Sequence, residues 1–163
     1  MTIFHIVTCP KAYSKLQAEI DAAAEREHIS SPITDAEAKT LLYLQACIKE
    51  GLRIWPPVTG LISKEAPEGG DFINKQFIPG GTKVAYCAWG VFRDKTIWGD
   101  DANSFRPERW LEADEERLKI MESTAEILFS PGRWQCLGKS IALIELNKVF
   151  VEVCCDIPGD ESH

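Results

Sequence analysis

Cys136 lies in a glycine-flanked loop that could present its thiol to a flat ligand. Gly132 stands four residues before the cysteine and Gly138 two residues after it. Because glycine lacks a Cβ atom, both positions let the backbone turn tightly and let a ligand approach closely. An apolar helical pattern begins directly after Gly138, and the N-terminus of a helix favours a thiolate. A thiolate held in this way can bind the iron of a haem from one face, with Phe129 as an apolar cover.

The same loop has a purely structural interpretation. A lone cysteine is most often a buried residue that packs like a small apolar side chain. The two glycines would then serve a tight turn and nothing more. Local spacing on its own favours this interpretation, so the choice between an iron ligand and a turn cysteine depends on the rest of the chain.

Length, composition and charge indicate a single globular domain. The chain has 163 residues, of which 45% are hydrophobic, and a formal net charge of −7 at pH 7. This acidic balance leaves no basic face for a nucleic acid. The six cysteines contain no C-x-x-C pair, which fits free thiols in a reducing compartment. We expect neither a signal peptide nor a membrane span, because no apolar run reaches about 18 residues.

Apolar residues at helical spacing predict three longer helices. The first covers residues 10–27 and begins with a proline in its first turn. The second covers residues 35–55, because Thr34 and Glu37 have the spacing of a capping box and apolar residues then recur at intervals of three and four. The third covers residues 139–154 and follows the cysteine loop.

The middle of the chain is predicted to contain the strands. Residues 58–87 read as extended segments, with strands over 72–78 and 82–87 around a hairpin turn at Pro79-Gly80-Gly81. The polar end from Asp156 to His163 is expected to fray. Together the elements predict a mainly α protein with a small β-sheet, an α+β fold.

Three sequence elements together resemble the cytochrome P-450 family of haem-thiolate monooxygenases. The run Phe129-x-x-Gly132-x-x-x-Cys136-x-Gly138 resembles the haem-binding loop, and its form GRWQCLGK is similar to the loop of fungal members. Glu50-x-x-Arg53, followed by two prolines, is similar to the E-x-x-R element of that family. The segment 105–110, which contains Arg109, resembles its P-E-R element. The three stand in the order that the family has.

The resemblance implies a haem cofactor with Cys136 as its axial thiolate ligand. Trp134 stands where the family has a basic residue for a haem propionate, and an indole N–H brings no charge. The implied haem contacts are Phe129, Gly132, Arg133, Trp134, Cys136, Gly138 and Lys64. Glu50, Arg53 and Arg109 are expected to converge in a buried charged triad that holds distant segments in register. The implied substrate-lining residues are Val58, Thr59, Gly60, Leu61 and Ile62.

The resemblance covers residues 10–153, and we expect residues 1–163 to be a single partial domain from the C-terminal part of the family fold. It implies a monooxygenase that acts on a small lipophilic substrate with NADPH-derived electrons from a reductase. Full-length relatives are expected at the cytoplasmic side of the endoplasmic reticulum membrane, whereas this chain is expected to lack the anchor and to be soluble and intracellular. Because the family's oxygen-handling helix is missing, the chain is expected to be inactive alone. The alternatives are a non-catalytic haem-binding fragment and a remnant of the fold without a cofactor.

Overall fold

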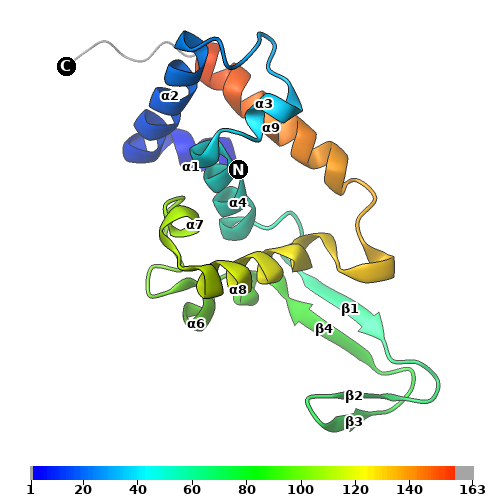
Figure 1. Ribbon diagram of the computed structural model, residues 1–163. Coiled ribbons are helices and arrows are strands. Elements are labelled where there is room, and N and C mark those ends of the chain that lie inside the picture. Colours follow the sequence, from blue (N-terminus) through cyan, green and yellow to red (C-terminus); the bar gives the residue numbers. More distant parts are fainter. Residues whose placement is uncertain (1, 157–163) are drawn as a thin grey trace.

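The computed structural model describes residues 2–156 and shows a helical body from which paired strands extend (Figure 1). The α+β class expected from the sequence is confirmed. Of the polar end expected to fray, residues 157–163 lie outside the described part of the chain. The helices are α1 (Thr2–Val7), α2 (Pro10–Glu25), α3 (Asp35–Ala38), α4 (Leu42–Ile54), α5 (Ala88–Val91), α6 (Lys95–Trp98), α7 (Arg109–Glu112), α8 (Glu115–Ala125) and α9 (Lys139–Asp156), with single 3-10 turns η1 (Glu126–Phe129) and η2 (Gly132–Trp134).

Helices α2, α4 and α9 enclose the larger core. Leu16 of α2, Leu44 of α4 and Val151 of α9 are each at most 1% exposed and belong to one apolar cluster. Full burial of such a side chain stabilises the fold by about 1.5–3 kcal/mol. Helix α2 ends two residues before the predicted boundary, because Glu27 adopts a φ of 55° that a right-handed helix does not allow.

The predicted helix over residues 35–55 is wrong as a single element. The capping box at Thr34 and Glu37 forms, but α3 ends at Ala38 and a new helix, α4, begins at Leu42. Glu19 of α2 accepts hydrogen bonds from the backbone N–H groups of Tyr43 (2.8 Å) and Leu44 (2.9 Å). A carboxylate from another helix therefore satisfies the first donors of α4, which permits the break.

The strands form two antiparallel pairs instead of the predicted hairpin at Pro79-Gly80-Gly81. Strand β1 (Leu61–Glu65) pairs with β4 (Lys83–Cys87), and β2 (Asp71–Ile73) pairs with β3 (Gln76–Ile78). The tight turn falls at Asn74 and Lys75, whose φ angles of 49° and 65° suit a two-residue hairpin. Residues 72–78 are thus a hairpin in themselves, and the Pro-Gly-Gly run joins the two pairs. Figure 1 shows β2 and β3 at the end farthest from the helices.

A second, smaller core lies where α4 meets the segment from α5 to α8. Phe92, Trp98, Trp110 and Met121 are buried there against Ala46 of α4. The predicted P-E-R segment therefore leads into this core, because Trp110 directly follows Arg109 in α7. Among the described residues, no helix is both long and apolar enough to cross a membrane.

Candidate functional site

The cysteine loop is a closed turn that holds Cys136 at the start of α9. The backbone N–H of Cys136 donates to the carbonyl oxygen of Phe129 over 2.7 Å, and the N–H of Lys139 donates to the carbonyl of Cys136 over 3.3 Å. Gly132 has a φ of 69°, so glycine is required there by backbone conformation. Cys136 itself is exposed and forms no disulfide. The expectation that a structural cysteine here would be buried is therefore wrong, whereas the choice between an iron ligand and a turn cysteine stays a prediction.

Large apolar side chains within a few residues of Cys136 in the sequence face solvent. Leu137 is fully exposed, Trp134 is 65% exposed and Ile141 is 63% exposed. Monomeric proteins rarely leave such a cluster uncovered, and an uncovered cluster marks a site for a ligand or partner. A thiol within a few residues of three exposed apolar side chains fits a large, flat, apolar group that offers a soft metal.

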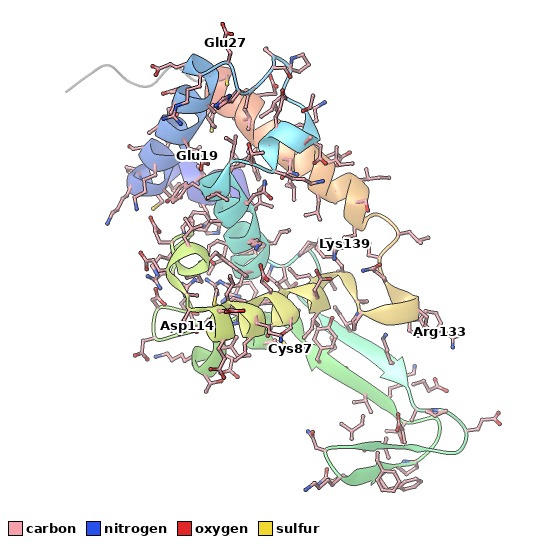
Figure 2. All side chains as sticks on the ribbon, in the orientation of Figure 1. Glu19, Glu27, Cys87, Asp114, Arg133 and Lys139 are labelled. Carbon is pink, nitrogen blue, oxygen red and sulfur yellow. The ribbon has the colours of Figure 1, made fainter. Side chains whose placement is uncertain are left out.

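Cationic side chains lie against the indole ring of Trp134. The Nζ atom of Lys64 is 5.9 Å from the ring centre, and the guanidinium carbon of Arg133 is 5.4 Å from it. Lys64 comes from β1, so a residue far away in the chain reaches the loop. Figure 2 shows Arg133 at the outer edge of the molecule. Trp134 lacks a charge, but the structure places positive charge beside it that could attract an acidic group.

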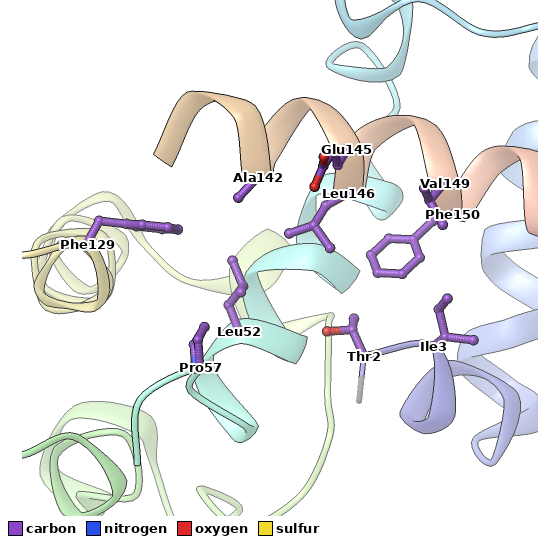
Figure 3. A pocket seen from close by; sticks show the side chains of 10 residues that line it. All are labelled: Thr2, Ile3, Leu52, Pro57, Phe129, Ala142, Glu145, Leu146, Val149 and Phe150. Carbon is purple, nitrogen blue, oxygen red and sulfur yellow. The ribbon is translucent and has the colours of Figure 1, made fainter. Parts of the chain in front are cut away.

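Phe129 joins the loop to a hollow between α1, α4 and α9 (Figure 3). The hollow has a volume of about 410 Å³, which lies within the range of small-molecule sites. Figure 3 shows Phe129 at one end, pointing toward Ala142 and Leu52, and Pro57 beside Leu52. The lining residues are Thr2, Ile3, Leu52, Pro57, Phe129, Ala142, Glu145, Leu146, Val149 and Phe150.

The segment predicted to line a substrate, residues 58–62, follows α4 and includes the first two residues of β1. Val58 is 53% exposed and Leu61, the first residue of β1, is 73% exposed. Pro57, the residue before this segment, lines the hollow. The hollow therefore borders one end of the predicted segment, and its remaining walls come from residues of α1, α4, η1 and α9 that the predicted substrate-lining set did not include.

Glu50 stands at the centre of a buried network that contains Arg53 and Arg109, as the three-residue pattern predicts. Its Oε1 atom accepts from Arg53 Nη2 at 2.8 Å and from Arg109 Nε at 3.0 Å. Its Oε2 atom accepts from Arg53 Nε at 2.9 Å. None of the three side chains is more than 2% exposed. Such charge-assisted bonds are shorter and stronger than neutral ones.

Sequence reasoning missed two further donors to Glu50. The indole Nε1 of Trp110 donates to Oε2 over 3.0 Å, and the backbone N–H of Arg106 donates to Oε1 over 2.9 Å. The position of Trp110 next to Arg109 could have identified it as a member of the network, whereas a backbone donor cannot be identified from the sequence. With these bonds the carboxylate accepts from five donors, and three of them lie in the segment 106–110.

The two arginines also bind backbone carbonyls of the connecting loops. Arg53 donates through Nη1 to the carbonyls of Phe92 (2.6 Å) and Ala102 (2.7 Å). Arg109 donates to the carbonyl of Trp98 over 2.6 Å and to the carboxylate of Asp101 over 3.0 Å. Burial acts to raise the pKa of Asp101, but the hydrogen bond and charge of Arg109 outweigh it, so this pKa lies below its ordinary value. The network is thus a structural joint between α4 and the irregular segment before α8.

The described residues contain no cluster of three or more His, Cys, Asp or Glu side chains with metal-binding geometry. The loop offers a single exposed thiol, which suits a metal whose other ligands come from a bound organic group.

Known proteins match the chain along nearly all of its length. The family model described as Cytochrome P450 matches residues 1–153. The cytochrome P450 monooxygenase abl1 of Leptosphaeria maculans is 44% identical over 153 residues, which cover 94% of this chain and 27% of that protein. The cytochrome P450 monooxygenase aba1 of Botryotinia fuckeliana is 42% identical over 152 residues (93% and 30%). Pisatin demethylase of Fusarium vanettenii is 37% identical over 161 residues (99% and 30%). The chain thus spans less than a third of the length of these relatives.

Proposed function

Because the chain belongs to the cytochrome P450 family of monooxygenases, we propose that it supplies the haem-thiolate loop of an oxidoreductase that inserts one atom of dioxygen into an organic substrate. The observation that carries this proposal is the exposed Cys136 thiol in a closed, glycine-containing turn beside exposed apolar side chains. The family implies haem, and the residues around Cys136 have the chemistry that this group needs.

Each part of the loop has its own proposed role in binding the haem. Cys136 would bind the iron through its sulfur, which the turn holds at the start of α9. Leu137 and Ile141 offer apolar surface to the porphyrin, and Phe129 covers the edge of the loop. Arg133 and Lys64 supply the positive charge for the propionates that Trp134 cannot supply.

The bound haem supplies an iron at which dioxygen is activated, and a thiolate ligand favours cleavage of the O–O bond. The chain's own residues hold the sulfur, exclude water from one side and accept the acidic edge of the group. The apolar hollow beside Phe129 is proposed to take part in holding a small lipophilic substrate. Electrons are proposed to come from NADPH through a reductase, and the full-length protein to act at the cytoplasmic face of the endoplasmic reticulum.

We further propose that the 163-residue chain alone does not complete the reaction. Leu137 and Ile141 stand in solvent here, so a haem bound to the loop would be open to water. Proton delivery to dioxygen needs a donor within hydrogen-bond reach and a shielded pocket. The openness of this face also favours the second candidate function, a haem-binding fragment that does not catalyse turnover.

A reductase-coupled assay tests these proposals together. The haem-loaded chain is incubated with NADPH, a reductase and lipophilic substrates, and product is scored against hydrogen peroxide. We expect NADPH consumption with peroxide and little product, and loss of that consumption in Cys136→Ser but not in Cys87→Ser, which removes another exposed thiol. Coupled product formation by the chain would overturn the proposal of inactivity, and equal consumption in Cys136→Ser would overturn the role of Cys136.

A further inference from the structure

Helix α9 carries apolar side chains on more than the face that it buries. Phe150 and Val151 lie in the core, while Ile141, Ile144 and Val149 are exposed. Hydrophobic burial is non-directional, so a helix of this kind gains similar free energy in more than one rotation about its axis. The apolar pattern therefore does not fix how α9 sits against α4.

A single buried amide removes this ambiguity. Asn147 is 2% exposed and lies on the inner face of α9. Its Nδ2 donates to Asp35 Oδ1 of α3 over 2.7 Å, and its Oδ1 accepts from Gln45 Nε2 of α4 over 3.0 Å. Both ends of the amide are thus paired, each with a different helix. A buried amide that loses such partners destabilises the arrangement in which it is left unpaired.

No neighbouring side chain on α9 can take the place of Asn147. Between Leu143 and Val151 the other polar residues are Glu145 and Lys148. A carboxylate can accept from Gln45 but would face the like charge of Asp35, and an ammonium can donate to Asp35 but cannot accept. A slip of α9 by one or two residues, or by one turn, would therefore leave Gln45 or Asp35 without its partner.

The position of α9 determines the position of the Cys136 thiol. The carbonyl of Cys136 accepts from the N–H of Lys139, the first residue of α9, and the carbonyl of Gly138 accepts from Ala142 at 2.9 Å. The loop is thus hydrogen-bonded to the helix and moves with it. Slipping a helix by one residue shifts it by about 1.5 Å and turns it by about 100°, which would carry the sulfur on the order of 5 Å.

We infer that Asn147 is a positioning residue, which fixes the rotation and axial placement of α9 and through them the location of the Cys136 sulfur. Its relevance to catalysis rests on the proposed function, since the sulfur matters to the reaction as an iron ligand. The placement itself does not depend on haem and can be measured without it. Buried polar groups that select one register among apolar alternatives have the same effect in helical assemblies.

A distance measurement between two spin labels tests the inference. One nitroxide is attached to Cys136 and the other to Ser14→Cys on the exposed side of α2, in a chain with Cys9, Cys87 and Cys155 changed to serine. Cys47 and Cys154 are buried, and burial raises the pKa of both thiols, that of Cys154 to about 11, so they react poorly with the label. The labelled chain that keeps Asn147 should give one narrow distribution of distances between the two labels.

Asn147→Leu should broaden this distribution or add a second maximum displaced on the order of 5 Å, because leucine keeps the volume and removes the polar bonds. Asn147→Asp keeps the shape, loses the donor and should do the same, so it carries the test if the leucine variant does not fold. Lys148→Leu is the matched control: it also replaces a polar side chain of the same helix with leucine, but it removes neither hydrogen bond of Asn147, so the distribution should stay unchanged. An unchanged distribution in both Asn147 variants, or equal broadening in the control, would overturn the inference.

The haem-bound state gives a second, separate readout. With haem added, Asn147→Leu should lose thiolate-type absorbance in the reduced carbon monoxide complex relative to the Lys148→Leu control at equal helical content. If the Asn147 chain itself shows no such absorbance, the proposed function fails. The label distances then still decide whether Asn147 positions the thiol.

Discussion

Removing the Glu50 carboxylate is expected to unfold much of the chain. Glu50 is fully buried, and its two oxygens accept from both Arg53 and Arg109, which are 1% and 2% exposed. Glu50→Ala leaves two buried guanidinium groups without their counter-ion, which costs about 3–5 kcal/mol. A domain of this size has a total stability of about 5–15 kcal/mol. The substitution is therefore expected to take roughly a fifth of the stability at the least and most of it in a marginal domain, so folding should be lost before any binding defect can be seen.

Urea unfolding, followed by circular dichroism, measures this loss directly. The isosteric Glu50→Gln separates charge from volume and should lose most of the same free energy, because a neutral amide does not compensate two cations. Glu122→Ala is the matched control: it breaks an exposed ion pair with Lys49, whose side chains are 49% and 42% exposed, and should cost at most about 1 kcal/mol. A loss below about 1 kcal/mol for Glu50→Ala, or a loss equal to that of the control, would refute the reasoning.

Three further substitutions and conditions test the architecture around the site. Trp110→Phe removes one hydrogen bond to the buried Glu50 carboxylate and should lower the free energy of unfolding by about 1.5–3 kcal/mol, measured in urea; a neutral result would mean that the indole N–H contributes nothing. Gly51→Ala places a Cβ where the Thr2 side chain of α1 packs, so residues 2–7 should exchange amide hydrogens faster, whereas unchanged exchange would contradict the close packing of α1 on α4. Asp101 and Glu108 have pKa values below their ordinary 3.8 and 4.5, Asp101 through Arg109 and Glu108 through Lys15, in both cases against the opposing effect of burial. The pKa values of these two carboxyl groups are lower in the folded than in the unfolded chain. The stability that the two ionised groups contribute is therefore present above about pH 4.5 and is lost as the pH falls through the folded-state pKa values. Asp101→Asn should reduce the loss of stability on acidification, and an unchanged dependence of stability on pH would contradict this role of Asp101.

The sequence predicted the charged triad because its residues carry a recognisable spacing. Glu50, Arg53 and Arg109 meet although Arg109 lies far along the chain, and the pattern identified each of them. The backbone N–H of Arg106 and the carbonyls that bind the arginines were not predictable, since every residue has these groups. Their use here follows from loop conformation, which is set by tertiary packing.

The errors in the fold prediction have local physical causes. The helix expected over residues 35–55 is interrupted because Glu19, in another helix, caps the start of α4, and no local pattern reports a cap from so far away. The hairpin turn was placed at Pro79-Gly80-Gly81 because glycine and proline are strong turn formers. Asn74 and Lys75 make the turn instead, and the Phe72 and Phe77 rings pair across it at 5.3 Å.

The roles of the candidate site residues toward a haem stay a prediction from the sequence, and the surroundings of these residues were not predicted. Loop spacing alone favoured a buried cysteine, whereas Cys136 is exposed. The approach of Lys64 to Trp134 depends on how β1 lies against the cysteine loop, and the hollow beside Phe129 depends on how α1, α4 and α9 meet. These are distances between segments far apart in the chain, which spacing within a motif does not determine.

The absorbance of the reduced, haem-loaded chain with carbon monoxide tests the central claim most directly. A thiolate trans to carbon monoxide gives a red-shifted Soret band, so we predict this band for the unsubstituted chain and for Cys87→Ser, which removes a different exposed thiol. Cys136→Ser should lose the band while keeping its helical content, since an exposed thiol contributes little to folding. A red-shifted band that survives in Cys136→Ser, or that is absent from the unsubstituted chain, would contradict the assignment of Cys136 as the iron ligand.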